Sequence, residues 1–352
     1  MKKRTQLMLS GALIASLAAL AMTANAAAWR TCNGNKQIWR SDWTNMYLST
    51  TSFPIGSQWD LRTQYKMAEW NAIGGSNFRF YVGRDTDGSH NSSNGRNEVY
   101  FEYKPSDSYL GVTRSRLTCY WLFGTRYGYD EADIGINTRY AWTLGDFTGS
   151  NTGSPYNFEL VMMHELGHAL GLLHYDGRPD TMNTYYFNGG PIGHYNTVEP
   201  HADDRWGLRL LYPDSTTERD VSVSRFYNTG GGASSFNRVR NTSGSWVTSL
   251  NRGSQYDLEY TLENLGTQGE TPSIRFYLST NNYISTGDTY LGGAGWNMPS
   301  GSYATADKRF TVPTGLRPGT YYIGFVVDPT GSIPEGSESN NFVSLLHPLT
   351  IR

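Results

Sequence analysis

The sequence predicts an α+β domain followed by an all-β domain in one chain. Up to residue 213, helical spacing of apolar residues is mixed with short stretches in which apolar and polar side chains alternate. After residue 219 only the alternating pattern occurs, and turn residues interrupt it often. The polar segment 214–219 interrupts both patterns, so we expect domains at 27–213 and 220–352 with a linker between them.

The first 26 residues have the composition of a secretory signal peptide. Basic residues at positions 2–4 precede an apolar run from Leu7 to Met22, and Ala24, Asn25 and Ala26 fit the small-residue site where such peptides are cut. The alternative, a membrane anchor, is disfavoured because the run is short for a spanning helix. We therefore expect a secreted, extracellular protein whose mature chain has no membrane span.

Within residues 27–213 the patterns predict a strand, a helix, several strands and a second helix. The first helix is predicted from the spacing of Leu61, Tyr65, Ala68 and Trp70. Short apolar runs between loops rich in Gly, Asn and Asp predict the strands. The expected ranges are a strand at 46–50, a helix at 58–73, and strands at 78–82, 99–103, 111–114 and 132–137.

The second helix carries a pattern of five residues, HExxHxxGxxH, that fits a catalytic metal site. His164 and His168 lie one helical turn apart, so both imidazoles can face one ion. Glu165 is placed to act on metal-bound water as the general base without binding the metal. Gly171 can adopt the left-handed conformation that ends helices, which lets His174 return as a third ligand. Three protein ligands leave one position open, as in catalytic zinc sites.

This stretch resembles the metzincin metalloproteases, in which the motif is followed by a turn that contains methionine. Residues 180–183, Asp-Thr-Met-Asn, fit that turn, and the resemblance implies that Met182 forms an apolar floor under the histidines. Residues 201–213 resemble the terminal helix of bacterial matrixin-type catalytic domains. The resemblance implies a metzincin-like domain, with a mixed twisted sheet and an active-site helix, that binds extended peptides by strand addition.

Departures from the family pattern leave the metzincin subfamily open. Tyr175 follows the third histidine, where matrixins typically have Ser, astacins Glu and serralysins Pro. Astacins and serralysins also carry Tyr two residues after the methionine, and this chain has Thr184 there. Tyr185 and Tyr186 come next and are candidates for contacting the substrate or the transition state. We expect the segments 149–155 and 187–197 to border the substrate cleft.

Charged residues suggest one further metal and exclude one class of partner. Asp85, Asp87 and Gly88, together with Asp130 and Asp133, could supply oxygen ligands for a structural calcium ion, although ordinary turn chemistry explains them equally well. The formal net charge is −2 and the basic residues are scattered, which argues against nucleic acid as a partner.

Cys32 and Cys119 are the only cysteines of the chain. In an exported protein the expected arrangement is a disulfide between them. The alternative is that Cys32 occupies the open zinc position as a latency ligand, as a propeptide cysteine does in matrixins. Residues 30–34, Arg-Thr-Cys-Asn-Gly, match that switch sequence poorly, so we expect the disulfide.

The pattern after residue 219 predicts an immunoglobulin-like β-sandwich. Alternation is clearest at 221–224, 256–262, 274–278 and 321–327. The segments 278–288, 319–323, 327–328 and 335–341 resemble the bacterial cell-adhesion-related domain called CARDB, and the resemblance covers most of 220–352. Such a domain could bind a surface or the substrate, or serve as a spacer, because sandwich folds host many roles.

These features together predict a secreted zinc metalloendopeptidase, with one zinc ion and with proteins or peptides as substrates. Two alternatives from other classes remain. One is an adhesion or carbohydrate-binding protein with an incidental metal site, which would not need the carboxylate of Glu165. The other is a zinc hydrolase that acts on cell-wall cross-links, because the motif by itself does not define the bond that is cut.

Overall fold

The computed structural model describes residues 27–86, 93–120, 126–144, 155–176, 180–184, 199–224, 238–345 and 348–352. Several expectations concern residues outside these ranges: the signal peptide at 1–26, Asp87, Gly88, Tyr185, Tyr186 and, apart from Pro155, the two segments expected to border the cleft. Within the described part, no helix is long and apolar enough to cross a membrane.

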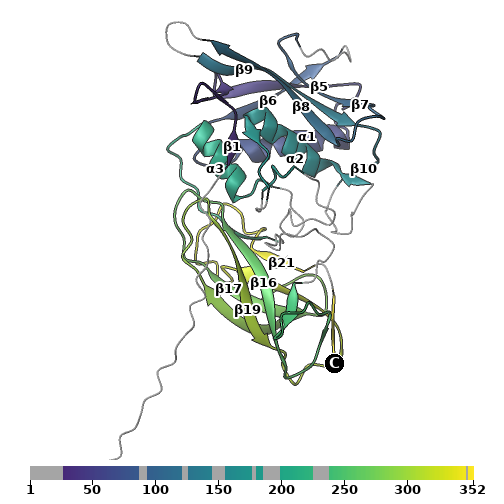
Figure 1. Ribbon diagram of the computed structural model, residues 1–352, viewed down its shortest axis with the longest axis vertical. Helices are drawn as coiled ribbons and strands as arrows, with labels where there is room; N and C mark the ends of the chain where they lie inside the picture. Colours follow the sequence, from purple (N-terminus) through teal and green to yellow (C-terminus); the bar gives the residue numbers. More distant parts are fainter. Residues whose placement is uncertain are drawn as a thin grey trace, which may run out of the picture.

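The chain forms two bodies that lie end to end (Figure 1), and the three helices found in the described residues belong to the first of them. One large cluster of buried apolar residues draws its members from positions 39–212, and a second draws them from 221–351. The polar segment 214–219 lies between the two clusters in the sequence. Helix α3 (Ala202–Leu211) lies against the second body, where Arg209 donates to the carbonyls of Leu265 and Gly266.

A six-stranded mixed sheet forms the frame of the first body. Its strands follow the order β4-β9-β7-β5-β6, and β8 adds to β9. All pairings in this sheet are parallel except that of β8 with β9, which is antiparallel. The bounds are β4 (Ile38–Trp39), β5 (Trp43–Ser49), β6 (Arg79–Asp85), β7 (Asn97–Glu102), β8 (Gly111–Tyr120) and β9 (Arg126–Asn137). The five strands predicted for this region are therefore present, and β8 and β9 are longer than expected.

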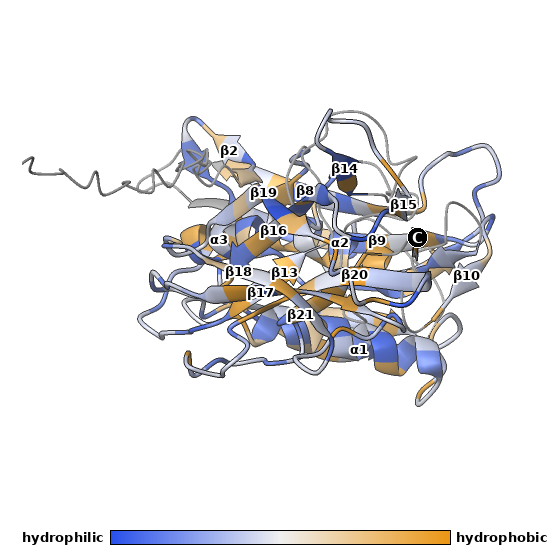
Figure 2. Ribbon diagram, turned by 90° about the horizontal axis from the view of Figure 1, so that it is seen from below, coloured by the Kyte–Doolittle hydropathy of each residue, from blue (hydrophilic) through white to orange (hydrophobic). Residues whose placement is uncertain are grey.

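The first helix, α1 (Gln58–Asn71), has the predicted position, but of the four residues expected on its apolar face only Trp70 is buried. Leu61 and Tyr65 were expected on the apolar side, yet they are 49% and 55% exposed. Lys66 is instead 2% exposed, and its Nζ lies 3.1 Å from a carboxylate oxygen of Glu69 and 3.3 Å from one of Glu159. Burial of this lysine is tolerated because two carboxylates surround the charge. Figure 2 shows hydrophilic residues over much of the visible surface of α1.

The second helix, α2 (Phe158–Leu170), is buried along nearly its whole length. The side chain of Asn157 caps its first turn by accepting a hydrogen bond from the Leu160 amide at 2.9 Å. The helix stops at Gly171, whose φ of 104° lies in the left-handed region, as expected from the sequence. The chain then enters β12 (Leu172–Leu173), which pairs antiparallel with β1 (Ala28–Trp29).

Two further short pairings complete the first body. Strand β2 (Thr31–Cys32) pairs with β3 (Asn35–Lys36), and β10 (Trp142–Thr143) pairs with β11 (Tyr156–Asn157). The expected disulfide is present and joins Cys32 to Cys119, so it ties the N-terminal hairpin to β8. With Cys32 bonded in this way, the structure does not use it as a metal ligand.

The second body consists of two sheets whose inward-facing side chains form one apolar cluster. One sheet contains β13 (Val221–Ser224), β14 (Val239–Asn241), β16 (Gln255–Asn264) and β19 (Tyr303–Thr311). The other contains β15 (Ser249–Leu250), β17 (Ser273–Ser279), β18 (Thr289–Gly295), β20 (Gly319–Val327), β21 (Phe342–Ser344) and β22 (Leu349–Ile351). Figure 2 shows apolar colouring concentrated on strands such as β17 and β20. The four predicted strands correspond to β13, β16, β17 and β20.

Candidate catalytic metal centre

Three histidines converge at the end of α2. His164 and His168 project from the same face of the helix, and His174 follows β12. The Nε2 atom of His174 lies 3.1 Å from the Nε2 atom of His164 and 3.1 Å from that of His168. Within the described part of the chain, these residues are the one group of three or more potential ligands whose donor atoms gather within 4.8 Å.

Backbone carbonyls fix the orientation of two of these rings. His164 Nδ1 donates to the Thr181 carbonyl at 2.8 Å, and His168 Nδ1 donates to the Leu172 carbonyl at 2.8 Å. In a neutral imidazole the second nitrogen then carries a lone pair, so both Nε2 atoms direct lone pairs toward His174. A proton on His174 Nε2 can satisfy only one of these lone pairs at a time, whereas a cation between the three nitrogens satisfies both. The arrangement therefore favours metal binding.

Burial keeps these histidines neutral. It lowers the pKa of His164 to about 4, mainly because the charged imidazolium would lose its hydration. The same cause lowers the pKa of His168 well below its ordinary value and also lowers the pKa of His174. All three are therefore available as ligands at neutral pH, since only the neutral ring offers a lone pair to a metal.

The donor set fits zinc. A tetrahedral zinc ion bound by nitrogens at about 2.0–2.1 Å places those nitrogens roughly 3.3 Å apart, and the Nε2 atoms of His164 and His168 each lie 3.1 Å from that of His174. Three imidazoles with a fourth position facing a pocket are a typical donor set for catalytic zinc. That pocket has a volume of about 610 Å³, and the three histidines, Glu165 and residues 108–113 are part of its lining.

Glu165 is 4% exposed and borders the same pocket. Burial raises the pKa of its carboxyl group to about 7, although the hydrogen bond from Thr113 opposes the shift. The Thr113 hydroxyl lies 2.7 Å from Glu165 Oε2. Strand β8 passes this close because it starts with a glycine: a Cβ on Gly111 would lie 2.9 Å from the Glu165 side chain. A carboxyl group with a pKa near 7 is suited to accept and return a proton at neutral pH.

Met182 lies under α2 beside Gly167. It is 2% exposed, and a Cβ on Gly167 would lie only 2.3 Å from its sulfur, so α2 can sit on this methionine only because residue 167 is glycine. The turn around it is held by two bonds: the Met182 amide donates to Asp180 Oδ1 at 2.7 Å, and its carbonyl accepts from the Tyr175 amide at 2.9 Å.

A carboxylate from α3 holds the same turn. Asp204 Oδ2 accepts from the Thr181 amide at 2.8 Å and from the His201 amide at 2.9 Å. The Thr181 carbonyl is the acceptor that orients His164. Partners that orient metal ligands in this way tune both geometry and affinity. The sequence motif indicates neither Asp204 nor Thr113, because each contact joins residues far apart in the chain.

Of the residues suggested for calcium, the three that the structure describes belong to no group of potential metal ligands among the described residues. Asp130 pairs with Arg40 at 3.1 Å, and Asp133 Oδ1 accepts from the Glu98 amide at 2.9 Å. Asp85 lies at the end of β6, and Arg96 is 3.9 Å from it. Burial raises the pKa of Asp133 to about 7.

Comparison with known proteins identifies both parts of the chain. The family model described as Matrixin matches residues 77–213, and the model described as CARDB matches residues 238–345. The chain is 34% identical over 82 residues to "Matrix metalloproteinase-25" of Homo sapiens, and equally to that of Mus musculus. These matches span 23% of this chain but only 14% and 12% of the two relatives. The chain therefore contains a matrixin domain followed by a CARDB domain, as the resemblance predicted.

Two solved structures with similarity to the chain each cover less than half of it. A CARDB domain from Pyrococcus furiosus, crystallised with two metal ions, matches 39% of this chain and 97% of its own, at 14% identity and a TM-score of 0.27. A beta-glucosidase from Listeria innocua matches 44% of this chain and 18% of its own, at 14% identity and a TM-score of 0.23.

Proposed function

We propose that this chain is a secreted zinc-dependent metalloendopeptidase that cuts peptide bonds in extracellular proteins. The observation that carries the proposal is the convergence of three imidazole lone pairs beside a buried carboxylate, in a pocket open to a substrate. The matrixin match over residues 77–213 supports the same chemistry. The N-terminal composition supports export, and the disulfide is in keeping with an oxidising compartment.

His164, His168 and His174 would hold the zinc ion, which supplies polarisation of the scissile carbonyl and a lowered pKa for the attacking water. Glu165 accepts a proton from that water at one of its carboxylate oxygens and passes it to the leaving amine. The hydroxyl of Thr113 donates a hydrogen bond to Oε2 of this carboxylate and so fixes its orientation. The general base is thereby kept beside the reacting atoms.

Strand β8 would align the substrate. It pairs with β9 along one edge, and its first residues, 111–113, line the pocket together with Glu165. An extended peptide could add to the other edge of β8 through main-chain hydrogen bonds.

We further propose a layout for the two domains. The mixed sheet supports a metzincin layout for residues 27–213, and the two sheets of the second body support an immunoglobulin-like sandwich for 220–352. The polar composition of residues 214–219 supports a domain boundary there.

The decisive experiment replaces the general base with an isosteric amide. Glu165→Gln keeps an oxygen that can accept from Thr113, so the protein should fold and bind zinc as the unmodified chain does. Cleavage of a fluorogenic peptide should fall by roughly 100- to 10,000-fold, the range typical of such groups. The matched control is Glu69→Gln, because burial also raises the pKa of Glu69 to about 7 but Glu69 is not part of the pocket lining. Near-normal cleavage by Glu165→Gln would exclude the assigned role.

A second set of measurements addresses the metal and the substrate class. His174→Ala removes one of three protein ligands, so elemental analysis should show loss of stoichiometric zinc, and a chelator should abolish cleavage by the unmodified protein. Gels containing a protein substrate, run beside gels containing cell-wall material, separate an endopeptidase from a hydrolase of cell-wall cross-links. Clearing of the cell-wall gel alone would contradict the proposed substrate class.

A further inference from the structure

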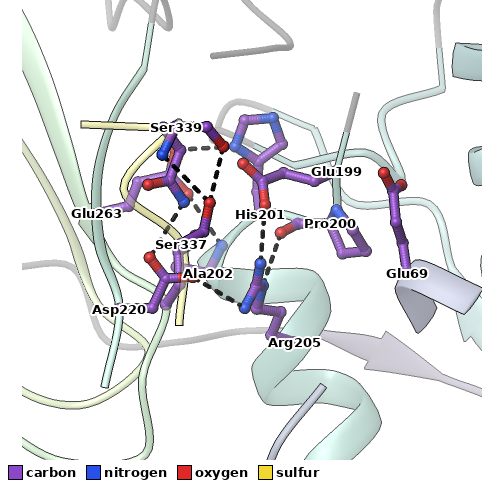
Figure 3. A network of polar contacts seen from close by, with 12 residues as sticks. Glu69, Glu199, Pro200, His201, Ala202, Arg205, Asp220, Glu263, Ser337 and Ser339 are labelled. Atoms are coloured by element: carbon purple, nitrogen blue, oxygen red, sulfur yellow. Dashed lines mark hydrogen bonds and ion pairs between the residues drawn. The ribbon is translucent and has the colours of Figure 1, made fainter. Parts of the chain in front are cut away.

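A glutamate from the CARDB domain caps the last helix of the matrixin domain. Glu263 lies on β16 and places one carboxylate oxygen 2.8 Å from His201 Nδ1 and the other 2.9 Å from the Ala202 amide (Figure 3). The side chains of Glu263 and His201 are both 0% exposed. The N-terminus of a helix has free amides and a partial positive charge, so a carboxylate at this position stabilises the start of α3.

From the start of α3 a continuous set of hydrogen bonds reaches the metal centre. The His201 amide donates to Asp204, which also accepts from the Thr181 amide, and the Thr181 carbonyl accepts from His164 Nδ1. Every residue of this path is buried except His164, which borders the pocket. The orientation of a proposed zinc ligand therefore depends on where the first turn of α3 lies.

We propose that Glu263 is a positioning residue for the metal centre, so that the CARDB domain helps to orient His164. This inference rests on the metal site proposed above. Removal of the carboxylate would leave His201 Nδ1 and the Ala202 amide buried without this acceptor, a loss that the first turn of α3 can relieve only by moving. Asp204 belongs to that turn and would carry the Thr181 peptide with it.

The same junction contains a second set of contacts centred on Glu218, whose side chain accepts from the Gly74 amide, Arg205 and Arg209 and bonds to neither Asp204 nor Thr181. Arg205 pairs with Glu199 at 3.0 Å and with Glu218 at 2.8 Å, and Arg209 pairs with Glu218 at 2.6 Å. Arg209 also donates to the Leu265 carbonyl at 2.7 Å. These bonds join the two bodies through α3 but do not include Asp204 or Thr181. Removal of one of these bonds is therefore a control for weakening the contact between the two domains in general.

The test uses the full chain and compares Glu263→Ala, Glu263→Gln and Glu218→Ala. The zinc dissociation constant is measured by competition with a chromophoric chelator, and the thermal midpoint is recorded for each variant. Zinc affinity of Glu263→Ala should fall roughly tenfold, the lower end of the range for residues that orient metal ligands. Glu263→Gln should recover only part of it, because an amide can still accept from Ala202 but replaces the carboxylate contact with His201 by a weaker, neutral one. Glu218→Ala should lower the midpoint yet leave zinc affinity within about twofold of the unmodified value.

A readout without metal separates this inference from the proposed function. In the presence of a chelator, hydrogen exchange at residues 180–184 should be faster in Glu263→Gln than in the unmodified chain and unchanged in Glu218→Ala. This measurement also applies if Glu263→Ala does not fold. Equal exchange in Glu263→Gln, native zinc affinity in folded Glu263→Ala, or equal loss of affinity in Glu218→Ala would each overturn the inference. Absence of zinc binding by the unmodified chain would instead refute the proposed function.

Discussion

The turn that ends α2 allows a quantitative test of how the backbone places the third histidine. Gly171 has a φ of 104°, a value that costs a residue with a Cβ about 1–2 kcal/mol or more. A Cβ there would also lie 3.3 Å from the Gln37 carbonyl oxygen, a tight contact with backbone that is itself hydrogen-bonded. We therefore expect Gly171→Ala to lower the free energy of unfolding by about 2 kcal/mol.

A second glycine isolates the contribution of φ. Gly56 has a φ of 78° but no atom within 4 Å of the position of a Cβ. Gly56→Ala should therefore cost only the conformational part, about 1 kcal/mol. Both variants are unfolded by urea in the presence of a chelator, so that bound metal does not contribute to the measured stability. Tryptophan fluorescence can follow the transition because α1 and its neighbours contain buried Trp70 and Trp39.

The gain in stability on adding zinc then tests whether the proposed ligands keep their positions. Leu172 and His174 follow the turn directly, and the Leu172 carbonyl orients His168. If residue 171 relaxes toward a negative φ, two of the three proposed ligands, His168 and His174, lose their positions. The gain in stability on adding zinc should therefore be smaller in Gly171→Ala than in Gly56→Ala. Equal destabilisation by the two substitutions, together with equal gains from zinc, would refute the argument that this turn sets the position of His174.

Two further predictions concern the general base and the disulfide. The proposed general base, Glu165, would act in its ionised form, and its pKa is raised to about 7, so kcat/KM should rise with pH through this region. Thr113→Val should move the rise to higher pH, because it removes a hydrogen bond that lowers this pKa. A pH profile identical to that of the unmodified chain would contradict the role of Thr113. Replacing both Cys32 and Cys119 with Ser opens a loop with a sequence separation of 87 residues, which should lower the free energy of unfolding by about 4–5 kcal/mol in the chain-entropy treatment, and urea unfolding that shows no loss would exclude that contribution.

Local spacing made much of the candidate site predictable. The positions of His164 and His168 follow from helix geometry, and the end of the helix follows from Gly171, so neither depends on distant parts of the chain. Thr113 and Asp204 could not be found in this way. Each contacts the site across a long stretch of sequence, and serine, threonine and aspartate at such positions are common in turns and caps.

The missed features of the fold have a similar origin. The buried face of α1 was not predicted correctly, because it contains Lys66. The charge of this buried lysine is paired with Glu159, a residue of another helix. Strand β19 was not predicted because, between buried Ala304 and buried Phe310, its inward side carries Ala306 and the half-buried Lys308 in place of large apolar residues. In both elements the side chains are matched to partners that only the tertiary structure supplies, so periodicity of the sequence gives no signal.

Helix α3 shows how the junction between the domains acquires a defined geometry. Its charged residues would ordinarily indicate a solvent-exposed helix, yet Asp204, Arg205 and Arg209 are all buried. Glu218 lies in the segment that its polar composition marks as a linker, and it pairs with both arginines. A buried charge is tolerated only where its partner is correctly placed, and loss of one partner typically costs about 3–5 kcal/mol. The junction therefore admits few relative orientations of the two bodies, and this restriction is what allows a residue such as Glu263 to act on the metal centre from the second domain.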